Sequence, residues 1–388
     1  MGMTEDYGAC AICECNMRVI DGDSHFIEPL DLFERYIDPA YRDRTVRVGV
    51  DSSGRVTGLI VDNRPMRMAD LDELMSACAG YGEKEEGRSI SDFDLYRIAS
   101  QKWQDMDLRI GYLDEEGFAA QVLYPTMGLL WESSVDDPRL ADALCRAYNT
   151  WAFELVAGHK DRLFPAAHIS MRDATLAAQE MARVAKLGCR IIFVGAAPIG
   201  GRSFGNPDFD PIWAAAQELD LAVGIHLVGH PNYTGSQWYR TGNPGFMYIT
   251  MMNVQDPRIA LTSMMYDGVF ERFPRLRVGT IESMAGWVGE WLERVDYRYK
   301  YLGHTSRMKH SAAEYFARNI WVSANPEERM FPLMVQFAGD DRFFIGSDYP
   351  HAEGFVHPVR TTRELLAALP ERSVEKILCD NAAAFYRI

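Results

Sequence analysis

The chain of 388 residues is 47% hydrophobic and 24% charged, which is the composition of a globular protein with enough apolar residues for a large core. Its 40 Lys and Arg residues against 55 Asp and Glu residues give a formal net charge of −15. This balance argues against nucleic acid and anionic membranes as partners, because both require a basic protein surface.

Residues 1–17 are predicted to be a disordered leader. Their C-x-x-C-x-C cluster (Cys10, Cys13, Cys15) is a weak metal signal, because a closed zinc site needs a fourth ligand and no further Cys or His lies nearby. The seven cysteines are odd in number and mostly scattered, which is typical of free thiols in a reducing compartment. We see no secretory signal and no run of about 18 apolar residues. We therefore expect a cytoplasmic protein that does not span a membrane.

From residue 18 onward, short β-rich runs alternate with helical patterns. The predicted strands are residues 18–25, 119–126, 163–169, 189–195, 221–227, 275–283, 320–325 and 343–349. Helices are predicted over 141–159, 175–188 and 210–220. Eight such units in series predict an α/β fold, a closed parallel (β/α)8 barrel of the TIM type forming a single domain over 18–388. A doubly wound open sheet is less favoured, because its first strand is normally followed by a Gly-rich turn.

The long interval between the first and second predicted strands departs from the regular spacing. Residues 26–118 are predicted to contain an insertion packed over the barrel mouth, with a polar, Gly-containing stretch at 80–92 (GYGEKEEGRSISD). Segments of this length without regular structure are usually functional or form contacts between subunits. A lid over the site and a subunit contact are both open for this insertion.

Ionisable residues collect where the predicted strands end. These are Asp23, His25, His226, Glu282 and Asp348. Barrel enzymes build their sites at the C-terminal ends of the strands, and closure brings the first and eighth strands together. Neutral imidazoles and carboxylates are ligands for a catalytic divalent metal. Asp21 shares the parity of Asp23 and His25 but lies one layer deeper, so we expect it to form hydrogen bonds rather than to bind metal.

Five stretches carry a resemblance to a known family: IDGDSHFIEP, AVGIHLVG, RVGTIESMAGWVGEWLERVD, FIGSDYPHAEG and KILCDNAAAFYRI. Together they resemble the amidohydrolase superfamily, in the branch (amidohydrolase family 2) that contains aminocarboxymuconate-semialdehyde decarboxylase and dinuclear iron oxygenases. The resemblance implies a distorted (β/α)8 barrel, one or two divalent metals, a small-molecule substrate, and a homodimer or larger homo-oligomer. It also implies that Asp23, His25, His226 and Asp348 are metal ligands.

Two positions depart from the decarboxylases that the chain resembles. Asp23-Ser24-His25 replaces the His-x-His pair of many members, and Glu282 replaces a His that generally serves in proton transfer or water activation. Three roles are open for Glu282: a general base, a carboxylate that orients His226, or a ligand to a second metal.

Counting Glu28 and His351, the chain offers more donors than one open mononuclear site uses: Asp23, His25, Glu28, His226, Glu282, Asp348 and His351. Iron or manganese is favoured and zinc is compatible with these ligands. The leading hypothesis is a dinuclear non-haem iron monooxygenase that hydroxylates a small organic substrate, with Glu282, Asp348 and His226 as catalytic residues. The alternative is a mononuclear metal-dependent decarboxylase or hydrolase of a small aromatic or unsaturated carboxylic acid.

Glu28 separates these two hypotheses. If its carboxylate reaches a second metal, the oxygenase is favoured; if it caps the turn at Pro29, the decarboxylase is favoured. A third hypothesis is an inactive barrel that serves as a partner subunit, in which the predicted donors would lie apart.

Overall fold

A computed structural model describes residues 19–50, 52, 56–66, 101–231, 245–351 and 354–388. Eight parallel strands form one sheet, in the order β1-β5-β6-β7-β8-β9-β10-β11. Their bounds are β1 (Val19–His25), β5 (Phe118–Tyr124), β6 (Leu163–His168), β7 (Ile191–Gly195), β8 (Ala222–His226), β9 (Val278–Ile281), β10 (Ile320–Ala324) and β11 (Phe343–Ile345). Each overlaps one predicted strand, and the (β/α)8 barrel is confirmed.

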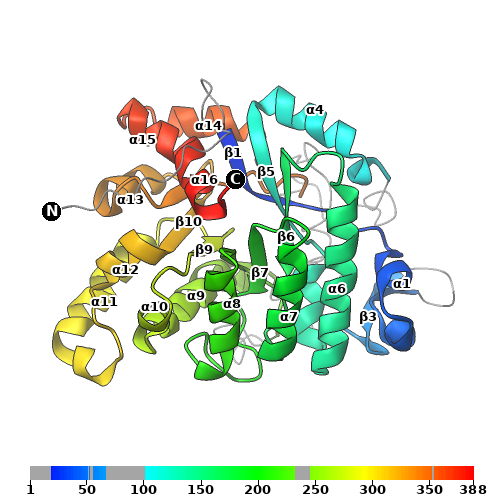
Figure 1. The fold of residues 1–388 in the computed structure, drawn as a ribbon. Helices are drawn as coiled ribbons and strands as arrows, with labels where there is room; N and C mark the ends of the chain where they lie inside the picture. Colours follow the sequence, from blue (N-terminus) through cyan, green and yellow to red (C-terminus); the bar gives the residue numbers. More distant parts are fainter. Residues whose placement is uncertain (1–18, 51, 53–55, 67–100, 232–244, 352–353) are drawn as a thin grey trace.

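The helices form a ring around the strands (Figure 1). Their bounds are α4 (Met106–Glu116), α5 (Gly128–Trp131), α6 (Pro138–Leu155), α7 (Ala174–Ala185), α8 (Asp210–Glu218), α9 (Gly245–Tyr266), α10 (Val269–Arg272), α11 (Val288–Leu302), α12 (Ala312–Asn319), α13 (Phe331–Ala338), α14 (Pro358–Leu365), α15 (Glu371–Glu375) and α16 (Asn381–Tyr386). The three predicted helices correspond to α6, α7 and α8. Helix α7 begins where the Asp173 side chain accepts hydrogen bonds from the amides of Thr175 and Leu176, a typical N-cap.

The barrel interior is filled by apolar side chains. Ile20, Val122 and Phe193 belong to the buried cluster that also contains residues of α16. The Phe385 ring of α16 stacks on Trp321 and Phe344, with centroids 5.3 and 5.7 Å apart. Arg277, which lies just before β9, donates to the Phe385 carbonyl at 2.8 Å, so α16 closes the N-terminal end of the barrel. A catalytic site is therefore expected at the opposite end, where the strands end.

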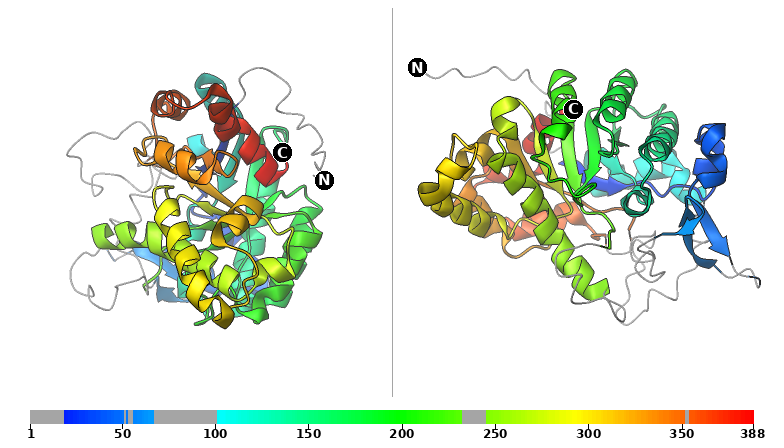
Figure 2. Two further views of the ribbon diagram at one scale, coloured as in Figure 1. Left: turned by 90° about the vertical axis from the view of Figure 1, so that its left-hand side faces the viewer. Right: turned by 90° about the horizontal axis from the view of Figure 1, so that it is seen from below.

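The described part of the predicted insertion adds a small structure beside the barrel. Helix α1 (Leu32–Tyr36) is followed by an antiparallel sheet of β2 (Arg47–Val50), β3 (Val56–Val61) and β4 (Arg64–Pro65). Figure 2 shows this sheet at one edge of the molecule. Arg44 holds it to the barrel, because the guanidinium pairs with Asp62 at 2.6 Å and with Asp137, the N-cap of α6, at 2.9 Å. The stretch at 80–92, on which the lid prediction rests, lies outside the described residues.

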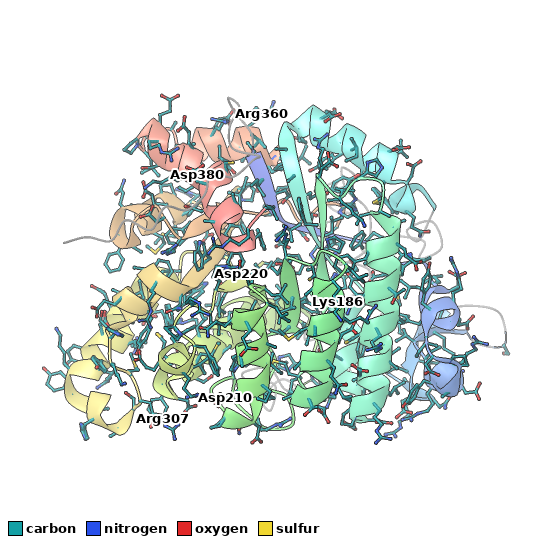
Figure 3. The ribbon with its side chains drawn as sticks, viewed as in Figure 1. Lys186, Asp210, Asp220, Arg307, Arg360 and Asp380 are labelled. Atoms are coloured by element: carbon teal, nitrogen blue, oxygen red, sulfur yellow. The ribbon has the colours of Figure 1, made fainter. Side chains whose placement is uncertain are left out.

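Charged side chains lie on the outside of the helical ring (Figure 3). Lys186, Asp220, Arg307 and Arg360 are exposed examples. Within the part of the chain that the structure describes, no helix is long and apolar enough to cross a membrane.

Candidate metal centre

The ends of four strands place the predicted donors. His25 and His226 are the last residues of β1 and β8, Glu282 directly follows β9, and Asp348 lies in the turn after β11. The side chains of the two histidines are completely buried, and that of Glu282 is 15% exposed. Because the carboxyl ends of parallel strands meet at one end of a barrel, residues far apart in the sequence converge there.

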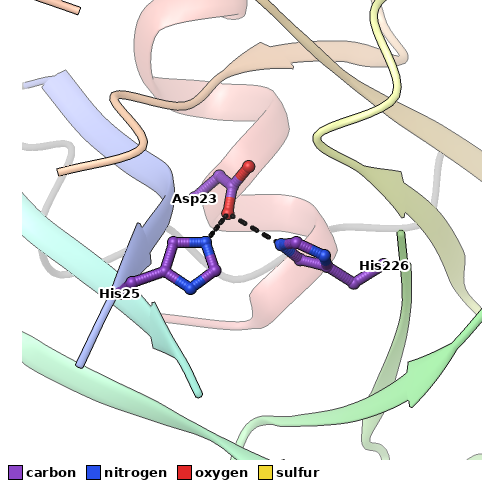
Figure 4. Close-up of side chains that lie close together, drawn as sticks. All are labelled: Asp23, His25 and His226. Atoms are coloured by element: carbon purple, nitrogen blue, oxygen red, sulfur yellow. Dashed lines mark ion pairs between the residues drawn. The ribbon is translucent and has the colours of Figure 1, made fainter. Parts of the chain in front are cut away.

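The donor atoms lie at separations close to those of ligands that share one ion. Asp23 Oδ1 lies 3.7 Å from His25 Nε2 and 3.6 Å from His226 Nε2 (Figure 4). Glu282 Oε2 lies 3.4 Å from His226 Nε2, and Asp348 Oδ1 lies 3.4 Å from His25 Nε2. Atoms that each bind an ion at about 2.1 Å are themselves roughly 3 to 3.5 Å apart. The donors are thus grouped, not spread apart as in an inactive barrel.

Hydrogen bonds on the far side of each imidazole fix its tautomer. His25 Nδ1 lies 3.1 Å from the Pro125 carbonyl, and His226 Nδ1 lies 2.8 Å from the Leu227 carbonyl. A carbonyl oxygen only accepts, so each Nδ1 carries a hydrogen and each Nε2 is the ring nitrogen that faces the other donors. Burial lowers the pKa of His25 well below its usual value and keeps it neutral. This is the arrangement that proteins use to orient histidine ligands.

A cation would satisfy three buried atoms that otherwise lack a partner. Among the described residues, Asp23 Oδ1, His25 Nε2 and His226 Nε2 are buried and make no hydrogen bond. Each unsatisfied buried polar group costs on the order of 1–3 kcal/mol, so three of them facing one another need an explanation. All three belong to one potential ligand group. The residues fit a divalent metal.

His351 lies against Asp348. Its Nδ1 is 2.8 Å from Asp348 Oδ1, and its ring stacks on His25 with centroids 4.0 Å apart. Its Nε2 is 2.7 Å from Thr126 Oγ1. The Thr126 hydroxyl donates to the Phe26 carbonyl at 2.6 Å, so it accepts from His351 Nε2–H. His351, Asp348 and His25 form a second potential ligand group, which shares His25 with the first.

Glu28 lies outside both donor groups. Its carboxylate accepts hydrogen bonds from the backbone N–H of Thr126 at 3.2 Å and of Met127 at 3.1 Å. Burial raises the pKa of Glu28 to about 7, although these amides act in the opposite direction. The side chain thus caps the turn before α5 rather than the turn at Pro29. This placement gives Glu28 a structural contact and leaves its ligand role without support from the geometry.

The two carboxylates that follow β9 and β11 lie on left-handed backbone. The φ angles are 53° at Glu282 and 55° at Asp348. A left-handed conformation costs a residue with a Cβ atom roughly 1–2 kcal/mol, and such residues concentrate at functional sites. In both turns the backbone adopts this unfavourable conformation at the residue whose carboxylate joins the donors.

Several buried polar residues near the centre were not predicted from sequence. Thr126 orients His351, and Arg109 donates to the carbonyl of His25 at 2.7 Å. Gln121 links Arg109 to Asp21, whose pKa burial raises to about 7. The hydrogen-bonding role expected for Asp21 is confirmed. A lone Thr, Gln or Arg in an ordinary strand or helix pattern gives no sequence signal of such contacts.

Comparison with known proteins points to one family. A family model described as an amidohydrolase matches residues 101–388. The chain is similar to the gamma-resorcylate decarboxylase of Polaromonas sp., at 24% identity over 279 residues, covering 67% of this chain and 82% of that protein. It is also similar to the 2-amino-3-carboxymuconate-6-semialdehyde decarboxylase of Dictyostelium discoideum, at 24% identity over 314 residues, covering 77% and 81%. A solved amidohydrolase structure from Mycobacterium avium subsp. paratuberculosis matches with a TM-score of 0.81 and 25% identity, covering 96% of this chain and 99% of that one.

Proposed function

We propose that this chain, which belongs to the amidohydrolase family and is an enzyme of that type, is a metal-dependent decarboxylase of a small aromatic or unsaturated carboxylic acid. The observation that carries the proposal is the convergence of Asp23, His25 and His226, whose facing atoms are buried without a hydrogen bond among the described residues. Decarboxylation is favoured over hydrolysis because both curated relatives named above are decarboxylases.

Asp23, His25, His226 and Asp348 would hold the ion. A divalent cation at this position supplies a Lewis acid that binds and polarises an oxygen of the substrate. The carbonyls of Pro125 and Leu227 keep both imidazole rings directed at the ion position, and His351 fixes Asp348. The chain therefore holds the metal-binding side chains in one orientation before an ion binds, which reduces the cost of reorganising them on binding.

The reaction also needs a proton. The bond between the ring or alkene carbon and the carboxylate breaks, CO2 leaves, and the electron pair left on carbon takes up a proton. Glu282 is the residue that we assign to this proton transfer, because Oε2 lies 3.4 Å from His226 Nε2 and the side chain is partly exposed. A positioned carboxyl group contributes typically about 10²–10⁴-fold in rate as a general acid or base.

The oxygenase hypothesis has less support. It rested on a count of donors that included Glu28 and His351. The Glu28 carboxylate accepts from backbone amides, and His351 contacts Thr126 and Asp348. The donors grouped around Asp23 suit one ion, and the named relatives support the decarboxylase alternative.

The test is to supply Mn2+ to the metal-free protein and follow CO2 release from gamma-resorcylate and a panel of hydroxybenzoates without oxygen. We expect CO2 release that requires the metal and one ion per chain. Oxygen consumption with reduced iron, no CO2 release and two ions per chain would instead establish the oxygenase. The homodimer or larger homo-oligomer stays a prediction, which sedimentation of the full chain would test.

A further inference from the structure

The barrel is closed between β1 and β11 by few backbone contacts. β1 forms a parallel ladder with β5, whereas an isolated bridge joins Ser24 to Tyr349 on its other side. Two backbone hydrogen bonds accompany the bridge: Asp348 N to Asp23 O at 2.9 Å and His25 N to Tyr349 O at 2.7 Å. This junction, which we call the seam, carries Asp23, His25 and Asp348. Their separation therefore depends on whatever else holds the seam together.

The Asp21 carboxylate holds the seam from the outer face of the sheet. It is completely buried and accepts from Ser347 on β11's side through both the backbone N–H, at 2.9 Å, and the hydroxyl, at 2.5 Å. Asp21 lies just before Asp23 in β1, and Ser347 directly precedes Asp348. Because both bonds end on one buried carboxyl group of β1, they fix one side of the seam against the other.

A second branch of the hydrogen-bond network around Asp21 reaches His25. Gln121 of β5 donates to Asp21 Oδ2 at 2.7 Å and accepts from Arg109 of α4 at 2.9 Å. Arg109, only 3% exposed, donates to the His25 carbonyl at 2.7 Å. Its guanidinium also lies 5.0 Å from the centroid of the Tyr349 ring. The network thus touches the backbone on both sides of the seam next to each of the three donors.

Stability alone does not account for these buried polar groups. A buried carboxyl group and a buried guanidinium lose hydration that their contacts commonly do not restore in full, and apolar side chains of the same size are often at least as stable. The layer between a barrel strand and its helix is ordinarily apolar. Apolar side chains could not fix the distance between β1 and the turn after β11, where an isolated bridge takes the place of a ladder.

We propose that Asp21, acting through Ser347, Gln121 and Arg109, is a positioning residue that sets the spacing of Asp23 and His25 against Asp348. The inference rests on the proposed metal centre, not on the reaction that the centre performs. Asp21 lies outside the potential ligand groups and acts by fixing the backbone that carries their side chains.

The experiment measures Mn2+ affinity by calorimetry on the full-length, metal-free protein, with thermal unfolding of the same samples. We expect Asp21→Ala to weaken Mn2+ binding roughly 10- to 100-fold, as loss of a supporting partner commonly does. Asp21→Asn keeps an acceptor for Ser347 and should restore part of the affinity. Ser347→Ala, which removes one bond to Asp21 and leaves its backbone N–H in place, should give a smaller loss and serves if Asp21→Ala does not fold.

Asn319→Ala is the matched control. Asn319 is also completely buried and donates to the carbonyls of Pro274 and Leu276, at the opposite end of the barrel. It should lower the melting temperature without changing Mn2+ affinity. Wild-type affinity in both Asp21→Ala and Ser347→Ala would overturn the inference, as would an equal loss in Asn319→Ala. A wild-type protein that binds Mn2+ but releases no CO2 would refute only the proposed reaction.

Discussion

Glu28→Gln tests the placement of Glu28 through the pH dependence of stability. The Glu28 side chain is buried, and burial raises its pKa from about 4.5 to about 7. In the unfolded chain the same carboxyl ionises near its ordinary pKa. Between these two values the folded protein keeps a proton that the unfolded chain has released, so stability falls as pH rises through this window. Below the lower pKa both states are protonated and the cost vanishes.

The magnitude follows from the size of the shift. A difference of roughly 2.5 between the folded and unfolded pKa values corresponds to a loss of about 3 kcal/mol in the free energy of unfolding, and this loss is complete above pH ~7. Glutamine has nearly the same shape, keeps an acceptor for the amides of Thr126 and Met127, and cannot ionise. The variant should therefore gain about 2–3 kcal/mol relative to the wild type when the pH is raised from 5 to 8.

Denaturant unfolding of both proteins at several pH values between 4.5 and 8 measures this difference. Because all other titrating groups are shared, subtracting the two curves isolates Glu28. Parallel curves would refute a buried carboxyl with a raised pKa at this position. Mn2+ affinity of the same variant addresses the ligand question: a large loss of affinity would show that Glu28 reaches the ion, whereas the geometry predicts an affinity close to that of the wild type.

Further predictions concern the centre and the packing of the barrel. His226→Ala should abolish Mn2+ binding while the far-ultraviolet circular dichroism stays unchanged, because it removes one of the facing donor atoms; a wild-type metal content would contradict the ligand role. Glu282→Gln should retain Mn2+ and lose roughly 10²-fold or more in CO2 release, and full activity would exclude the proton transfer that we assign to it. Gly346→Ala should lower the free energy of unfolding by about 1–3 kcal/mol, because the added Cβ would lie 2.3 Å from Asp23 Cβ. Gly111→Ala, on an exposed turn of α4 with nothing within 4 Å of the added Cβ, should raise it by about 0.5–1 kcal/mol. Denaturant unfolding measures both changes.

The barrel could be predicted from sequence because its signal is local and repeated. Each strand is a short apolar run followed by a polar end, and the runs at 163–169 and 320–325 match β6 and β10 closely. The last strand was predicted too long, over 343–349, and is observed as Phe343–Ile345. The polar residues after Ile345 form a turn, in which the Ser347 hydroxyl accepts from Tyr349 N–H and Asp348 takes a positive φ.

The partners of the buried polar residues could not be predicted, because they are distant in the sequence. The amides that bind Glu28 belong to the turn after β5, and the residue that pairs with Asp21 belongs to the turn after β11. Strand parity was also insufficient in β1. The register against β5 shifts between Asp21 and Ser24. A bulge of this kind redirects side chains without a characteristic sequence, so Asp21 contacts the outer layer while Asp23 reaches the other donors.

The seven predicted donors therefore divide into two sets by the contacts that they make. Asp23, His25 and His226 form one potential ligand group, and Asp348 Oδ1 and Glu282 Oε2 each lie 3.4 Å from the Nε2 atom of one of its histidines. Glu28 and His351 contact other groups of the protein: backbone amides in the case of Glu28, and Thr126 and Asp348 in the case of His351. A count of donors in a motif sets an upper limit on the metals bound, because a residue that supports a ligand has the same chemistry as the ligand. Among the described residues, the facing atoms buried without a hydrogen bond, Asp23 Oδ1, His25 Nε2 and His226 Nε2, belong to one potential ligand group, and we therefore propose one ion at this position.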